Sequence, residues 1–102
     1  MAEISKQGTL STSGTIIATG ADGVTILLNK INVLRFNNPA AYTIQLYKYE
    51  AATGTTTLIY NLSLAAGDTV TDNLIYALNP GDQLKAYSNI TGTTYYAYGI
   101  SN

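Results

Sequence analysis

The chain has 102 residues, a formal net charge of −1, only 11% charged residues, nine Tyr, and neither Cys nor His. The absence of Cys and His excludes disulfide bonds, Cys/His zinc sites and nucleophile–histidine catalysis. The five basic residues are spread along the chain, and no apolar run approaches the ~20 residues of a membrane helix, so we expect neither nucleic-acid nor membrane binding.

The N-terminal third predicts strands separated by turns. Residues 1–13 are polar and weakly patterned, so we expect an extended arm or an edge strand, and they lack the apolar region of a signal peptide. Residues 15–19 predict a strand, and 20–23 its turn. Residues 24–37 are mostly apolar and too long for one average strand, so we expect a bend near Asn29 and an end before Pro39.

The middle of the chain predicts a β-hairpin. Residues 42–50 alternate with a period of two, which is typical of a half-buried strand. Residues 51–54 predict a turn, and 57–64 continue the alternation. This alternation places four apolar residues on one face: Leu58, Tyr60, Leu62 and Leu64.

The C-terminal third repeats this pattern. After a turn at 65–68, one phase of the next strand holds Val70, Leu74, Tyr76 and Leu78, with Asp72 among them. Residues 79–82 (NPGD) predict a type II turn, because Pro suits its first central position and Gly its second. Residues 83–90 alternate, 91–93 turn the chain, and 94–100 predict a final strand.

These segments predict an all-β fold. Seven or eight short strands, with turns at intervals typical of a sandwich, indicate two antiparallel sheets in a jelly-roll or immunoglobulin-like arrangement. We expect one sandwich domain over residues 14–102, preceded by the arm or edge strand at 1–13. Strand order depends on long-range pairing, which local patterns do not reveal.

The acidic residues do not predict an active site. Asp22, Asp68 and Asp82 lie beside Gly in predicted turns, where Asp commonly bonds nearby backbone. Asp72 shares a phase with apolar residues and indicates a strand end, a bulge, or a link to Lys48 or Arg35. A carboxylate-pair hydrolase is the one enzyme class left feasible. We predict no enzyme, no cofactor and no metal site, because no loop has the spacing of a calcium-binding loop.

The tyrosines provide the candidate binding residues. The polar faces of their strands hold Tyr47, Tyr49, Tyr87 and Tyr95, with Gln45 beside them. Tyr42, Tyr60, Tyr76 and either Tyr96 or Tyr98 fall with the apolar phase. The exposed set has three interpretations: strand propensity with cross-strand packing, a subunit interface, or a platform for sugar rings.

The low charge distinguishes among these interpretations. Soluble domains average about a quarter charged residues, well above the 11% here, and interface cores are depleted of charge. The composition therefore favours a permanently assembled protein.

Three segments carry a resemblance to a known class. Residues 64–72 (LAAGDTVTD), 78–86 (LNPGDQLKA) and 95–100 (YYAYGI) resemble the small all-β structural proteins of tailed-phage virions, over about the C-terminal third. The resemblance is one of turn pattern. It implies a jelly roll or related sandwich, often trimeric, serving as head decoration (cement), neck, tail or host-attachment component, and it carries no functional residues.

Composition and resemblance together predict a structural role. We expect a capsid decoration protein that binds assembled shell subunits, with the major capsid protein or other virion proteins as partners and a homo-oligomer, preferably a trimer. It would be made in the host cytoplasm and located in the virion. The alternative is a carbohydrate-binding, host-attachment module of a phage tail or fibre, in which the exposed tyrosines contact sugars.

Overall fold

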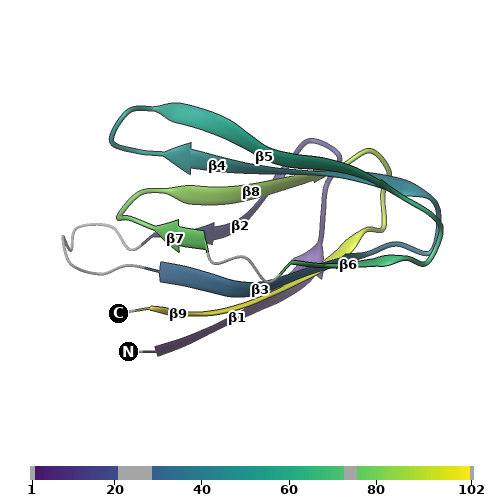
Figure 1. Ribbon diagram of the computed structural model, residues 1–102, viewed down its shortest axis with the longest axis horizontal. Coiled ribbons are helices and arrows are strands. Elements are labelled where there is room, and N and C mark those ends of the chain that lie inside the picture. The colour runs from purple at the N-terminus through teal and green to yellow at the C-terminus, as the bar shows by residue number, and fades with distance from the viewer. Residues whose placement is uncertain (1, 21–28, 73–75, 102) are drawn as a thin grey trace.

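The computed structural model describes residues 2–20, 29–72 and 76–101, which form strands and no helix (Figure 1). The strands are β1 (Ala2–Thr9), β2 (Thr15–Thr19), β3 (Asn29–Asn37), β4 (Tyr42–Glu50), β5 (Thr55–Leu64), β6 (Thr69–Asp72), β7 (Tyr76–Leu78), β8 (Gln83–Ser88) and β9 (Thr94–Ser101). The described residues therefore contain no helix that could cross a membrane.

The strands form two antiparallel sheets in separate layers, with β4, β5 and β8 above β3, β9 and β1 in Figure 1. The first sheet has the order β1-β9-β3-β6, and β7 also pairs with β3; the second sheet has the order β2-β8-β4-β5. The predicted two-sheet antiparallel sandwich is confirmed, with nine strands in the described residues where seven or eight were expected.

Strand pairing identifies the sandwich as a jelly roll. β4 pairs with β5, β3 with β6 and β7, β2 with β8, and β1 with β9. The pairs are nested, and successive pairs lie in alternate sheets, as when one long hairpin is rolled up. Among the two topologies that the sequence left open, this order selects the jelly roll.

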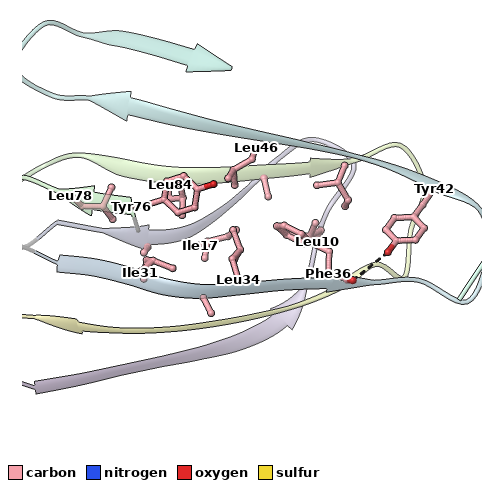
Figure 2. Close-up of a cluster of buried hydrophobic side chains, with 14 residues drawn as sticks. Leu10, Ile17, Ile31, Leu34, Phe36, Tyr42, Leu46, Tyr76, Leu78 and Leu84 are labelled. Carbon is pink, nitrogen blue, oxygen red and sulfur yellow. Dashed lines mark hydrogen bonds between the residues drawn. The ribbon is translucent and has the colours of Figure 1, made fainter. Parts of the chain in front are cut away.

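The core lies between the sheets and consists mainly of the inward-facing residues of their strands (Figure 2). Phe36 and Leu34 come from β3, and Leu46 and Leu84 from the opposite sheet; none is more than 1% exposed. Full burial of one such side chain stabilises the fold by about 1.5–3 kcal/mol. The alternating pattern of the sequence is what gives each sheet this apolar inner face.

A β-bulge corrects the predicted face of β5. Leu46 pairs with Tyr60 and Tyr47 with Leu58, so Ile59 has no partner in β4. Because directly opposed residues lie on the same face of a sheet, Tyr60 lies inward with Leu46, and Leu58 lies outward with Tyr47. The prediction that Leu58 shares a face with Tyr60 and Leu62 was therefore wrong. Alternation counts residues and cannot register an inserted one.

The turns at 51–54 and 79–82 form as predicted. The Gly54 N–H donates to the Glu50 carbonyl at 2.8 Å, and Gly54 has φ +69°. The Asp82 N–H donates to the Asn79 carbonyl at 2.9 Å, and Gly81 has φ +84°, as a type II turn requires at its second central position. The bend expected near Asn29-Lys30 is not found there, because these two residues begin β3, whose pairing with β9 shifts register between Ile31 and Val33. Of the turn expected at 20–23, residues 21–23 lie outside the described part of the chain.

A buried polar cluster joins the end of β3 to the turn before β9. The Asn38 amide nitrogen donates to the Thr93 hydroxyl at 2.7 Å and to the Thr91 carbonyl at 3.2 Å. The Asn38 side-chain oxygen accepts the Ala40 N–H at 3.0 Å, and the hydroxyls of Thr93 and Ser88 are 2.6 Å apart. The side chains of Asn38, Ser88 and Thr93 are each at most 2% exposed. Hydrogen bonds within the cluster therefore take the place of hydrogen bonds to water.

Candidate binding surfaces

Four of the five predicted site residues lie together on the outer face of the second sheet. Tyr47, Tyr49 and Gln45 alternate with inward residues of β4, and Tyr87 in β8 is directly opposite Gln45. The strand pairings place three rows of directly opposed residues across this face. The central row runs Ile16–Lys85–Tyr47–Leu58 over β2, β8, β4 and β5. We call this surface the tyrosine face.

Side chains on the tyrosine face contact one another. The rings of Tyr47 and Tyr87 meet edge to face with centroids 5.1 Å apart, and the Tyr47 hydroxyl donates to Gln45 Oε1 at 3.3 Å. Lys85 Nζ lies 5.8 Å from the centre of the Tyr49 ring, within reach of a cation–π interaction. These contacts form within the protein itself and need no partner.

The tyrosine face is apolar at its ends and weakly charged. Ile16 is 49% exposed and Leu58 is 48% exposed. Among the described residues in its rows, Lys85 is the only charged one. The hollow on this face, lined by Gln45, Tyr87 and neighbouring polar residues, holds only about 190 Å³. The surface is thus nearly flat.

The fifth predicted residue, Tyr95, lies elsewhere. It packs against the core from β9 and is directly opposite Phe36 and Gly8. Its ring covers Gly8 so closely that a Cβ there would lie 3.1 Å from the ring. The expectation that Tyr95 is on a polar face was wrong, because the run Tyr95-Tyr96-Ala97-Tyr98 has tyrosine in both phases.

Tyr96 and Tyr98 both lie on the outer face of the first sheet, where the sequence analysis placed no site, so the expectation that one of them falls with the apolar phase was wrong. A depression of about 470 Å³ is lined by Gln7, Arg35, Asn37, Thr94 and Tyr96 among others, and the half-buried Tyr95 also contributes to its lining. A second, of about 390 Å³, is lined by Val33, Arg35, Tyr96 and Tyr98. Because they share Arg35 and Tyr96, we treat them as one surface, the first-sheet groove. The alternation of Tyr96 and Tyr98 with small Ala97 and Gly99 was the signal that could have identified it.

Asp72 belongs to a buried cluster between the sheets and not to an open cleft. It accepts a hydrogen bond from the Tyr76 hydroxyl through Oδ2 and is 8% exposed. The Tyr60 hydroxyl is also buried; it lies near Asp72 but outside full hydrogen-bond geometry with any described group. Burial, and then the nearby Asp72, raise the pKa of both tyrosines well above its usual value. Both therefore remain protonated at neutral pH, and the cluster has a structural role.

Asp82 bonds turn backbone through its carboxylate, whereas Asp68 contributes through its main-chain carbonyl. Asp82 Oδ1 accepts the Ala51 N–H at 2.9 Å, and Oδ2 accepts the Asn79 N–H at 3.1 Å. The carbonyl of Asp68 accepts the Tyr42 hydroxyl, and Tyr42 is within reach of the Phe36 carbonyl too (Figure 2). Within residues 2–20, 29–72 and 76–101, no group of acidic side chains is arranged to hold a metal ion.

Comparisons with known proteins identify the fold. No family model and no curated protein matches the chain. A solved structure described as "Bacillus endospore appendages form a novel family of disulfide-linked pili" matches with a TM-score of 0.55 over 97% of this chain and 82% of that one. Sequence identity is 17%, so the match shows a common fold.

Proposed function

We propose that the protein is a non-enzymatic structural subunit that assembles with other protein subunits through the tyrosine face. The observation that carries the proposal is the chemistry of this face: half-buried tyrosines between exposed Ile16 and Leu58, with Lys85 as the one charged residue in the described rows. Interface cores are rich in tyrosine and poor in charge. Pre-formed contacts within the face also reduce the entropy lost on binding.

The size of the face favours a repeated contact. Neighbouring strands are about 4.8 Å apart, so the sheet is about 15 Å wide, and residues 43–49 extend about 20 Å. This footprint of about 300 Å² is below the ~800 Å² that a standard interface buries on each partner. A subunit with such a face gains stability when many copies bind in register.

Two kinds of assembly meet this requirement. The fold match to a pilus protein supports an appendage subunit. That protein is described as disulfide-linked, whereas this chain contains no Cys and would depend on non-covalent contacts. Capsid decoration, with a trimer as the preferred oligomer, remains the prediction from sequence. In either case a protein that binds only the assembled state stabilises that state by mass action.

The test is self-association measured by sedimentation velocity over a range of concentrations, together with fractionation of the native particle. Leu58→Lys places a charge in the central row of the tyrosine face, and we expect it to weaken assembly by at least about tenfold. Thr71→Lys, an exposed position on β6 in the first sheet, is the matched control. We expect wild-type assembly to persist in molar salt, because few charges are involved. Equal loss in both variants, or dissociation by salt, would refute the proposal.

A further inference from the structure

The first-sheet groove has chemistry that the assembly role does not use. We propose that it binds a polysaccharide containing acidic sugars, with Tyr96 and Tyr98 beneath the sugar rings and Arg35 paired with a carboxylate. The groove lies on the sheet opposite the tyrosine face, so a subunit could hold both partners at once.

The dimensions of the groove suit an extended ligand. Its two depressions, about 470 and 390 Å³, are each in the range typical of small-molecule sites, and they adjoin at Arg35 and Tyr96. One sugar unit would leave part of this surface empty. A chain of several units would cross both depressions.

The two tyrosines form a platform within it. Tyr96 and Tyr98 are alternate residues of β9, so they lie on one face about 6.8 Å apart, while Ala97 between them is buried in the core. Tyr96 is 37% exposed. A tyrosine ring offers an apolar surface and a polar hydroxyl together, which matches the apolar C–H face and hydroxyl rim of a sugar ring.

The polar groups beside this platform are free to bind a ligand. Gln7, Tyr96 and Arg35 are directly opposite one another on β1, β9 and β3. The side chains of Gln7 and Arg35 have no hydrogen-bond or ion-pair partner among the described residues. On the tyrosine face, by contrast, Tyr47 and Gln45 are bonded to each other. Unpaired donors on a structured surface are what a hydroxyl-rich ligand requires.

The charge of the groove selects the kind of sugar. Arg35 is exposed and is the only charged residue among the described lining residues. A guanidinium binds a carboxylate through two parallel hydrogen bonds, which are stronger than neutral ones. A glycan with regularly placed carboxylates therefore satisfies Arg35, whereas a neutral glycan leaves it unpaired.

A peptide fits this surface less well. Extended peptides usually bind a sheet by adding a strand at its edge, where backbone groups are unpaired. β9 lies between β1 and β3, and is paired with both, so the groove offers side-chain contacts only. Those contacts suit a ligand recognised through hydroxyls and carboxylates.

The test is calorimetric titration of the full chain with oligogalacturonate and with polysialic acid, and with the methyl ester of oligogalacturonate as the uncharged counterpart. We expect binding of an acidic oligomer and about tenfold weaker binding of the ester. Arg35→Gln should reduce affinity for the acid about tenfold and remove the difference between acid and ester. Tyr98→Ala should weaken both, whereas Tyr49→Ala on the tyrosine face should change neither.

Several results would overturn the proposal. One is the absence of binding of both acidic oligomers up to a Kd of about 1 mM. Another is acidic-glycan binding that Arg35→Gln leaves unchanged, or that Tyr49→Ala reduces equally. Binding of poly-L-glutamate as tightly as the sugars would assign the groove to a protein partner instead. Melting curves of each variant show whether a loss of glycan binding is due to unfolding. If Tyr98→Ala is unstable, the conservative Arg35→Gln change at an exposed position still tests the proposal.

Discussion

Replacing Asn38 tests whether the buried polar cluster determines the stability of the fold. Asn38→Ala removes the hydrogen bonds to Thr93, Thr91 and Ala40, and a neutral hydrogen bond contributes about 1 kcal/mol net. The expected loss is therefore about 3 kcal/mol, from a total stability on the order of 5–15 kcal/mol. For a domain of this size, that loss corresponds to a fall in Tm of about 12–24 °C.

The preceding residue supplies a matched control. The two N–H groups of the Asn37 amide nitrogen are shared among three acceptors, the carbonyls of Gly67 at 3.0 Å and Asp68 at 3.3 Å and the Thr69 hydroxyl at 2.9 Å. These bonds are exposed, so water can replace them, and Asn37→Ala should cost less than about 1 kcal/mol. Urea denaturation, monitored by tyrosine fluorescence, measures the loss of stability in both variants. Equal losses, or a smaller loss for Asn38, would refute the role given to burial.

Three further outcomes are expected from the same denaturation assay. Tyr76→Phe should lose about 1–3 kcal/mol because it removes a donor to buried Asp72, and Tyr60→Phe should lose less, because no acceptor lies in full hydrogen-bond geometry with the Tyr60 hydroxyl. Both tyrosines have a raised pKa in the folded state, so their contribution to stability should be constant below about pH 10 and be lost above it, and the fall in stability above pH 10 should be smaller in the Tyr60→Phe/Tyr76→Phe double variant; an unchanged profile would contradict this. Gly20→Ala should cost about 3 kcal/mol, because its Cβ would lie 2.0 Å from the Asn79 carbonyl oxygen; a variant with wild-type Tm would contradict this.

Alternation and turn chemistry were enough to predict most of the strands. Residues 15–19 and 42–50 were predicted with the bounds that the structure has, because each lies between clear turn signals. The type II turn at 79–82 followed from Pro80 and Gly81 alone. The nested strand order could not be predicted in this way, since it depends on pairings such as Ala2 with Ser101, which no local pattern contains.

The binding surfaces were predicted only in part for the same reason. Period two placed Tyr47, Tyr49 and Gln45 on one face of β4, and the structure brings Tyr87 beside them. It could not assign Tyr95, because tyrosines occupy both phases of β9. The first-sheet groove was missed because Gln7 and Arg35 join Tyr96 only through the pairing of three strands distant in sequence.

The nested pairing has a consequence for the order of folding. β4 and β5 are joined by a short turn, so this hairpin closes a small loop and is the least costly pair to nucleate. β1 and β9 close nearly the whole chain, and Glu3 and residues 5–9 of β1 are exposed, so little apolar burial drives that last step. We therefore expect the sandwich to propagate outward from the β4–β5 hairpin, and β1 to dock last and detach first. Since β1 contributes Gln7, the first-sheet groove would then be the last part of the molecule to mature.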